Sequence, residues 1–385
     1  MTRRRYEPKS CAVFVTGMVD MTSGGDIHAI RFAEHWAESR GPAYIIGPPA
    51  IQQLLRPGSR AELISPWVPL ERALSASFAA YPALCAVRTL IYAAAAPQVD
   101  WTVAASHFLS DVAASVLGSR RANRAVYVHH IIAQQSRKRG FRSTASIIQE
   151  RLSLSLLRLF TTIFVCDPRA AAWLTDRLGP GRLATTGNGC DPPTLPPMSK
   201  DRSSAIFLGR LTEEKGATEF VRIANLMNRR RPGIQFHIIG MGPCRAEMED
   251  LATDAGLRCT FHGFVQEAEK WKLLAESGVF IAPSHEEGWG IAVDEALAAG
   301  TDVVCYALEA YDRLGSAVHG VPIGDLELAA RAALEVLDGL AGEARHAPQH
   351  PGATSWSTVL GHEIEAMLSQ AGERNLERMS WLRAP

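Results

Sequence analysis

Residues 284–300 carry the pattern from which the rest of the fold follows: they read Ser284-His285-Glu286-Glu287-Gly288-Trp289-Gly290-Ile291-Ala292-Val293-Asp294-Glu295-Ala296-Leu297-Ala298-Ala299-Gly300. The apolar run 278–283 before them ends in a proline and predicts a short buried strand. Residues 291–299 predict a helix that ends before Gly300. In the loop, Gly288 and Gly290 allow a ligand to approach the backbone closely. The pattern therefore predicts a strand, a glycine-bearing loop and a helix.

Two carboxylates flank this turn, Glu287 in the loop and Glu295 in the helix, with seven residues between them. Carboxylates accept hydrogen bonds from adjacent hydroxyl groups, as on a ribose or a hexose. The N–H groups at a helix N-terminus suit a sugar oxygen or a phosphate. A nucleotide sugar has all of these groups. The alternative is an ordinary loop-to-helix turn whose acidic residues offset the helix dipole.

A second loop, which contains two basic residues, follows the predicted strand 204–208. It reads Gly209-Arg210-Leu211-Thr212-Glu213-Glu214-Lys215-Gly216. We expect Thr212 to cap a helix that begins near Glu213. Arginine clamps phosphate oxygens in pairs and lysine adds a mobile charge, so together they can neutralise a departing diphosphate. Taken singly, each residue is more often a surface charge.

These two motifs together resemble the signature of retaining GT-B glycosyltransferases of the large Glu-x7-Glu group, which is similar to glycosyltransferase family 4. The resemblance implies that Arg210 and Lys215, beside Gly209, hold the donor diphosphate. It also implies that Glu287 holds the sugar hydroxyls and Glu295 the ribose. Backbone N–H groups of Gly288, Trp289, Gly290 and Ile291 would meet the sugar or the β-phosphate. No acidic cluster demands a divalent metal, and the expected cofactor is none beyond a UDP-sugar co-substrate.

Two more donor-side positions, Gly240 and Phe264, follow from the same resemblance. Gly240 closes the predicted strand 235–239; alone it is a weak dinucleotide signal, because Arg245 occupies the third glycine place. Phe264 lies in the loop whose backbone meets the nucleotide base in the family. His285 and Glu286 are an uncommon lead-in to Glu287, and either could contact the sugar or be solvated.

In the first half, a predicted strand at 11–16 precedes Gly24 and Gly25, and a helix is expected from about Ile27 to Ser39. In the resembled family a glycine pair here faces the donor phosphates; a plain tight turn is the alternative. The predicted strand 125–128 ends in His129 and His130. The family often carries a histidine near the donor sugar at this place, which His129 matches best and His130 second. A histidine bonded only by the backbone is the alternative.

Strands and helices alternate along the whole chain, which predicts doubly wound parallel sheets with helices on both faces. Ligands of such sheets lie at the carboxyl ends of the strands. A proline-rich segment near 191–197 marks the best boundary. We therefore expect GT-B architecture, with an acceptor-side Rossmann-like domain over 1–195, a donor-binding one over 196–355, and a C-terminal helix over 356–385 that returns to the first domain.

Composition excludes several functional classes. The chain has 385 residues with 40 basic and 40 acidic ones, so no basic field favours nucleic acid. Seven scattered cysteines without paired spacing favour a reduced, cytoplasmic protein. No stretch predicts a membrane span, because Arg88 interrupts the longest apolar region. The basic amphipathic stretch 134–160 allows peripheral contact with a membrane or an anionic acceptor, but it favours a helix packed on the sheet.

The sequence thus predicts transfer of a hexose, for example glucose or N-acetylglucosamine, from a UDP-sugar with retention of anomeric configuration. Attack would come from the face of the leaving group, without metal. The acceptor stays open, and an Ala/Arg-rich composition suggests a bacterial natural-product or envelope acceptor. Two rivals remain: a UDP-sugar 2-epimerase of the same fold, which needs acid–base carboxylates, and a non-catalytic nucleotide-sugar-binding protein. Monomer and homodimer are both open.

Overall fold

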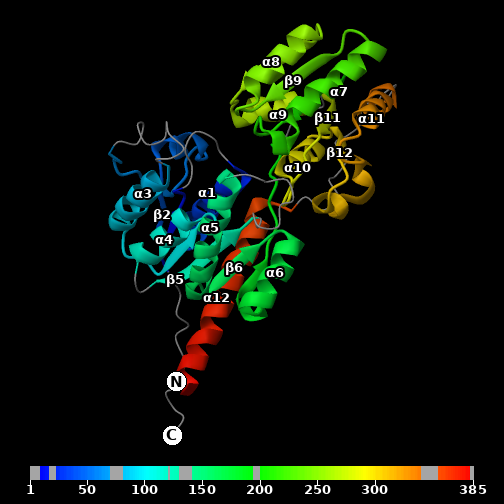
Figure 1. Cartoon of the computed structure of the whole chain (residues 1–385). Helices are drawn as coiled ribbons and strands as arrows, with labels where there is room; N and C mark the ends of the chain where they lie inside the picture. The colour runs from blue at the N-terminus through cyan, green and yellow to red at the C-terminus, as the bar shows by residue number, and fades with distance from the viewer. Residues whose placement is uncertain are drawn as a thin grey trace. The chain divides into compact units, whose positions relative to one another are not determined.

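The computed structural model describes residues 9–16, 23–69, 81–119, 122–129, 141–193, 200–339 and 354–381. The chain divides into two compact units, one of residues 1–188 with 356–385 and the other of residues 189–355. In Figure 1 the red C-terminal helix α12 (Trp356–Trp381) runs beside the blue and green elements of the first unit. The second unit is therefore inserted between two parts of the first.

The first unit is built on a parallel sheet with strand order β3-β2-β1-β4-β5-β6-β7. Its strands are β1 (Cys11–Phe14), β2 (Ala43–Ile46), β3 (Glu62–Ile64), β4 (Trp101–Ala104), β5 (Asn123–Val128), β6 (Thr162–Val165) and β7 (Leu183–Thr185). Its helices are α1 (Gly24–Ser39), η1 (Pro49–Leu54), α3 (Tyr81–Ala95), α4 (Leu109–Gly118), α5 (Phe141–Leu156), η3 (Leu157–Leu159), α6 (Pro168–Leu178), η4 (Pro180–Arg182) and α12.

Alternation along each strand divides the first unit into two cores, because successive side chains of a strand point to opposite faces. In β1, Cys11 and Val13 pack with residues of α1 and α12. Ala12 and Phe14 pack on the other face with residues of α3 and α4. The remaining core on that face joins β5 and β6 to α5 and α6. Helices therefore cover both faces of the sheet, as predicted.

The helix α12 completes the core that α1 covers. Its Trp356, Leu360, Ile364 and Met367 are buried, at the three- to four-residue spacing of one helix face. The polar residue Glu363 is buried on the same helix and is 3% exposed. The predicted final helix is thus confirmed, and it spans Trp356–Trp381.

The helix α1 begins earlier than predicted, and this corrects the placement of the glycine pair. Ser23 is the N-cap, its side chain accepts from the Asp26 backbone, and the Asp26 carboxylate accepts from the Ser23 backbone at 2.8 Å. This capping box starts the helix at Gly24, because it satisfies two N–H groups that the helix end leaves open. Gly24 and Gly25 are therefore the first helical residues and not part of a loop.

The helix α5 packs on the sheet as predicted, but its outer face is not simply polar. Glu150 and Ser153 are buried. Ile148 and Leu152 lie on the opposite side, 55% and 56% exposed. The basic residues 137–139 of the same stretch lie outside the described residues.

The second unit has its own parallel sheet, with strand order β10-β9-β8-β11-β12-β13. Its strands are β8 (Asp201–Leu208), β9 (Gln235–Ile239), β10 (Arg258–Gly263), β11 (Ser277–Ala282), β12 (Asp302–Tyr306) and β13 (Val318–Val321). Its helices are η5 (Glu213–Lys215), α7 (Ala217–Arg230), α8 (Arg245–Asp254), α9 (Glu267–Glu276), α10 (Ile291–Ala298), η6 (Glu309–Ala317) and α11 (Leu326–Gly339).

The same alternation builds this unit. Val279 and Ile281 of β11 pack with residues of α7, α8 and α11. Phe280 and Ala282 pack on the opposite face with residues of α9 and α10. Both units are thus three-layered α/β folds of the Rossmann type, and the predicted fold class is confirmed.

Candidate functional site

The loops that carry the predicted donor residues leave the carboxyl ends of four strands, β8, β9, β10 and β11. Within the sheet, β8 lies between β9 and β11, so the chain leaves β8 to one side and later returns on the other. Parallel strands place their carboxyl ends along the same edge. This edge of the second unit therefore gathers Gly209, Gly240, Phe264 and residues 284–290 by topology alone.

The contact between Lys215 and Glu287 is the centre of this edge. Lys215 ends the short helix η5 after β8, and Glu287 lies in the loop after β11. The Lys215 Nζ atom is 2.6 Å from Glu287 Oε1, and the two side chains are 21% and 14% exposed. Ser284 Oγ donates to the same carboxylate oxygen at 3.1 Å. The structure therefore brings together a cation and an acid that are 72 residues apart in the sequence.

Gly216 explains how these two loops come so close. It has a left-handed φ of 67°, and a Cβ atom there would overlap the carbonyl oxygen of Pro283. Only glycine meets both conditions without strain. The close approach of the two backbones sets Lys215 beside the loop that holds Glu287.

The start of η5 differs from the prediction. Thr212 is the N-cap residue, but its side chain makes no capping hydrogen bond. Residues 213–215 form a single 3-10 turn, and the α-helix begins only at Ala217, after Gly216 has turned the chain. The expected capped helix from Glu213 is therefore wrong, because the close packing on Pro283 interrupts it.

The loop between Glu287 and α10 is fixed by contacts of Trp289 with Asp294 and Arg313, two residues that the sequence did not single out. Trp289 Nε1 donates to Asp294 Oδ2 at 2.6 Å. Arg313 Nη2 donates to both Asp294 oxygens at 2.9 and 3.0 Å and to the Trp289 carbonyl at 3.0 Å. The Arg313 guanidinium also lies 4.1 Å from the centroid of the Trp289 ring. Arg313 comes from η6, so no local motif could have revealed it.

Gly290 is the N-cap residue of α10. It has a left-handed φ of 87°, and a Cβ atom there would overlap the ring of Tyr311. The first N–H groups of a helix have no partner inside it. The N–H groups of Ile291 and Ala292 at this helix start, a few residues after Glu287, could therefore stabilise an anion or a sugar oxygen.

Glu295 lies one turn into α10 and is held by Lys270 of α9. The Lys270 Nζ atom is 2.6 Å from Glu295 Oε1 and 2.9 Å from Glu267 Oε1. Burial lowers the pKa of Lys270, but the two carboxylates outweigh it and the pKa is raised above its ordinary value. Lys270 is a second residue that the sequence analysis missed.

The other donor-side positions are distributed as follows. Arg210 Nη2 lies 3.7 Å from Glu214 Oε1, and its side chain is 36% exposed, so it remains accessible. Gly240 has a φ of 138°, and a Cβ atom there would overlap the Gly209 carbonyl oxygen. Phe264 is 50% exposed after β10. Gly209 and Gly240 thus pack together, whereas the ion pair of Arg210 is with Glu214 and that of Lys215 is with Glu287.

His285 is a correction, since the sequence left it as either a sugar contact or a solvated residue. Its ring is buried against α7, where Nε2 lies 2.8 Å from Glu219 Oε1. Tyr306 donates to the other Glu219 oxygen at 2.6 Å. The backbone N–H of His285 donates to the Glu214 carbonyl at 2.9 Å. His285 therefore anchors the loop before Glu287 to α7 through its buried side chain.

In the first unit the structure brings His129 next to the glycine pair. A Cβ atom at Gly25 would overlap the His129 ring, and the ring bonds the Ala105 carbonyl through Nε2 at 3.0 Å. The ring also stacks on Tyr127, with centroids 5.9 Å apart. Burial, aided by the charge of His28, lowers the pKa of His129 to about 4. His129 is therefore neutral at pH 7, with Nε2 as the donor and Nδ1 as an acceptor.

Two further predicted positions lie near His129 in the sequence or the fold. Gly24 begins the same helix turn as Gly25. His130 lies outside the described residues.

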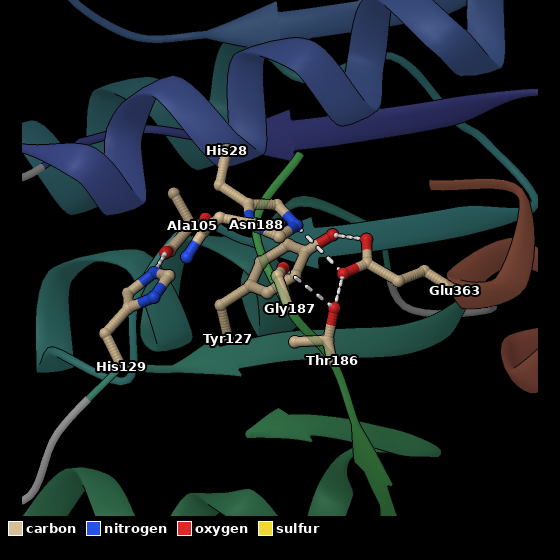
Figure 2. Close-up of polar contacts among 8 residues, drawn as sticks. All are labelled: His28, Ala105, Tyr127, His129, Thr186, Gly187, Asn188 and Glu363. Carbon is tan, nitrogen blue, oxygen red and sulfur yellow. Dashed lines mark hydrogen bonds and ion pairs between the residues drawn. The ribbon is translucent and has the colours of Figure 1, made fainter. Parts of the chain in front are cut away.

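Figure 2 shows the buried polar cluster beside His129. Glu363 of α12 accepts from Tyr127 at 2.6 Å, contacts His28 Nε2 at 2.8 Å, and also bonds Thr186. His28 Nδ1 bonds Asn188 Oδ1 at 2.8 Å. Burial lowers the pKa of His28, but the Glu363 charge and the hydrogen bonds to Glu363 and Asn188 together outweigh burial, so the pKa is raised. Glu363 thus joins α12, α1, β5 and the end of β7.

The fold and this edge define a class of protein. The chain has two Rossmann-type units, and the second carries a cation and acids at its topological switch point. This is the GT-B architecture. Residues 196–315 match the family described as glycosyl transferases group 1. The match covers the part of the chain that carries both donor-side motifs, and this part is similar to GT-B glycosyltransferases of the Glu-x7-Glu, family-4-like group.

Individual relatives agree with this assignment. The chain is 28% identical over 256 residues to a phosphatidyl-myo-inositol mannosyltransferase of Mycolicibacterium smegmatis, covering 60% of this chain and 66% of that protein. It is 34% identical over 134 residues to a 2-deoxystreptamine N-acetyl-D-glucosaminyltransferase of Streptomyces fradiae, covering 33% of this chain and 32% of that protein. The matches thus span no more than about two thirds of these relatives.

A solved structure shows the same fold over nearly the whole chain. It is that of Anabaena Alr3699/HepE in complex with UDP and glucose, with a TM-score of 0.66 and 15% sequence identity. The alignment covers 94% of this chain and 100% of that one.

Among the described residues, no group of three or more His, Cys, Asp or Glu side chains is arranged to hold a metal ion. In the same residues, no helix has the length and apolar character needed to cross a bilayer.

Proposed function

We propose that this chain transfers a hexose from a nucleoside-diphosphate sugar, with UDP as the nucleotide, to a small-molecule or cell-envelope acceptor. The observation that carries the proposal is the 2.6 Å contact between Lys215 and Glu287 beside the left-handed start of α10. One cation, one acid and a set of helix N–H groups meet there. These are the partners that a diphosphate, a sugar hydroxyl pair and a β-phosphate require.

When the donor binds, Lys215 and Glu287 each exchange the other for a group of the donor. The diphosphate oxygens replace Glu287 on Lys215, while sugar hydroxyls replace Lys215 on Glu287. Arg210 is accessible and adds a second cation to the diphosphate. As the bond to the sugar breaks, charge grows on the departing phosphate, and a cation already in place stabilises it without further reorganisation.

The expected stereochemistry is retention, with acceptor attack on the face that the diphosphate leaves. The departing phosphate takes the acceptor proton, so that no protein carboxylate needs to form a bond to the sugar. Glu287 is hydrogen-bonded by Ser284 and paired with Lys215, which suits a hydroxyl acceptor better than a nucleophile. In the first unit, neutral His129 would offer Nδ1 as a hydrogen-bond acceptor.

A thermal-shift panel of UDP-, GDP- and dTDP-sugars tests the proposal. A ligand that binds only the folded state raises the melting temperature by mass action, by an amount that grows with its concentration over Kd. We expect the largest shift with a UDP-hexose, and loss of the shift in Lys215→Met. A flat panel for all three nucleotide series would overturn the proposal. Formation of an epimer from the donor alone would favour the 2-epimerase instead.

A further inference from the structure

Lys270 is the charged group that holds the buried side of Glu295. It projects from α9, and its ammonium group lies between two carboxylates, 2.6 Å from Glu295 Oε1 and 2.9 Å from Glu267 Oε1. Lys270 is 12% exposed and Glu295 17%, whereas Glu267 is 65% exposed. The lysine therefore joins one solvated acid to one that is largely withdrawn from water.

The position of Lys270 is fixed by its neighbours on α9. Trp271 is buried in the core between α9, α10 and the sheet, and its Nε1 donates to Glu267 Oε2 at 3.2 Å. Glu267 and Lys270 lie three residues apart on one helix, which is the spacing of neighbours on a helix surface. A continuous series of contacts thus runs from the core through Glu267 and Lys270 to Glu295. Such support is what keeps a ligand-binding side chain in one orientation.

The contact with Lys270 leaves Glu295 able to accept further hydrogen bonds. Among the described residues, the hydrogen bond and ion pair of this carboxylate are made through Oε1 to Lys270. A carboxylate has two oxygens and about four acceptor positions. Oε2, and the second lone pair of Oε1, are then available to two adjacent hydroxyl groups such as those of a ribose.

Charge matters as much as geometry here. Burial raises the pKa of Glu295, and the Lys270 charge opposes that effect. Without Lys270, a carboxylate in this place would lose its compensating charge and would favour the protonated form. A protonated acid has one oxygen committed as a donor, so it accepts less well from a diol.

We propose that Lys270 is a positioning residue for the nucleotide ribose, which keeps Glu295 ionised and oriented to accept from the 2′ and 3′ hydroxyl groups. The inference rests on the proposed function, because it takes a nucleoside diphosphate as the ligand of this edge. It goes beyond that function by naming the residue that sets the preference for ribose over a sugar without these hydroxyls. Lys270 itself does not touch the reacting atoms.

Calorimetric titration of UDP and of 2′,3′-dideoxy-UDP tests this role in the full chain. The variants are Lys270→Met, which keeps most of the apolar stem, and Glu295→Gln. The matched control is Lys272→Met on the same helix, where the lysine is 63% exposed and 3.9 Å from Glu276. Lys270→Gln, with a polar side chain, serves if the methionine variant does not fold.

We expect the wild-type protein to bind UDP about tenfold or more tightly than the dideoxy analogue, as for hydrogen bonds to a charged acceptor. Lys270→Met should lose most of this preference by weakening UDP alone. Glu295→Gln should do the same, and the double variant should add little, because coupled residues are not additive. Lys272→Met should bind both ligands as the wild type does.

Three results would overturn the inference. In the first, Lys270→Met weakens both ligands equally, which indicates general damage to the site. In the second, Lys270→Met keeps the ribose preference while Glu295→Gln loses it; Glu295 then acts without Lys270 and the proposed function stands. In the third, the wild type binds neither ligand nor any nucleoside diphosphate, and the proposed function fails as well.

Discussion

Under the proposed function, the ion pair between Lys215 and Glu287 has a consequence for ligand affinity. A free diphosphate must displace the Glu287 carboxylate from Lys215 and then lie near its negative charge. A nucleotide sugar recovers that cost, because its hydroxyl groups bond the displaced carboxylate. The two parts of the donor therefore help one another to bind.

This exchange predicts opposite effects of Glu287→Gln on two ligands. UDP should bind roughly three- to tenfold more tightly, because Lys215 is released and a negative charge is removed. The UDP-hexose should bind less tightly, because a neutral amide is a weaker acceptor for hydroxyl groups. Titration of both ligands measures the difference, with the neighbouring Glu286→Gln as control. Equal weakening of the two ligands would contradict the exchange.

Asp111 provides a second prediction for a single residue, one of pH dependence. It is buried at the start of α4 and accepts from the Thr16 backbone at 2.7 Å, the Thr16 hydroxyl at 2.6 Å and Ser106 at 2.6 Å. Burial raises its pKa from 3.8 to about 6, although these hydrogen bonds oppose the shift. Between these values the folded state binds more protons than the unfolded state. The contribution of Asp111 to stability therefore falls as the pH rises from about 4 to 6.

The size of this effect is on the order of 3 kcal/mol for a shift of this extent. Asp111→Asn removes the titration while keeping a similar shape. We expect the difference in unfolding free energy, wild type minus variant, to decrease between pH 4 and 6 and to stay constant above pH 7. Urea unfolding across this range measures it. Parallel curves for the two proteins would show that the carboxyl is not shifted.

At the scale of elements, the contact of η5 with the loop after β11 depends on a single glycine. Gly216→Ala would combine a left-handed φ with overlap on the Pro283 carbonyl, so we expect a loss of about 2–4 kcal/mol in unfolding free energy. The control is Gly256→Ala, with a φ of 61° and nothing within 4 Å of the added Cβ. It should cost only about 1–2 kcal/mol, from the backbone alone.

Denaturant unfolding of both glycine variants, with UDP titrations, measures this difference. Gly216→Ala should also weaken UDP binding, because Lys215 is the adjacent residue and must move with the loop. Gly256 lies after α8, so its variant should bind UDP normally. Equal stability losses in the two variants would mean that the loops do not need to approach so closely.

The sequence predicts the elements well where hydrophobic periodicity is strong. The strand β9 has the predicted limits, since its apolar run ends at the turn that begins with Gly240. The start of α1 was missed, because Ser23 and Asp26 form a capping box that outweighs the low helix propensity of two glycines. The helix η5 was misjudged because its end depends on Pro283, which lies far away in the sequence.

The same distinction applies to the candidate site. Residues such as Lys215 and Glu287 lie in short motifs, so the sequence indicates them directly. Lys270 and Arg313 act through contacts with other elements, and neither belongs to a motif. The spacing of Glu267 and Lys270 predicts an ion pair on a helix, but only the packing of α9 beside α10 shows that this pair reaches Glu295. His285 illustrates the reverse error, since its neighbours in sequence suggest a ligand contact and its side chain turns inward.

At the scale of the whole molecule, each unit has its own core and the donor-side edge lies in only one of them. On heating, the unfolding transitions of the two units should therefore respond differently to ligand and to substitution. UDP should raise the stability of the second unit, because the proposed donor site lies there. Substitutions around Glu363 should act on the first.

Glu363→Leu tests this separation. The change leaves His28, Tyr127 and Thr186 without their shared acceptor, and an abandoned buried polar group costs about 1–3 kcal/mol. We expect the unfolding transition of the first unit to fall by several degrees, while the shift produced by UDP at the second unit stays intact. Differential scanning calorimetry with and without UDP resolves the two. Loss of the UDP shift in this variant would contradict the assignment. Glu365→Leu, on the same helix, is the control.

The position of α12 also bears on how the protein is made. Trp356, Leu360, Ile364 and Met367 complete the core of the first unit, yet they are synthesised after all of residues 189–355. On the ribosome, the nascent first unit must therefore wait with an open apolar face while its neighbour emerges. The donor-side unit can reach its native form first, and chaperones would find their binding surface on the part of the protein that was translated earliest.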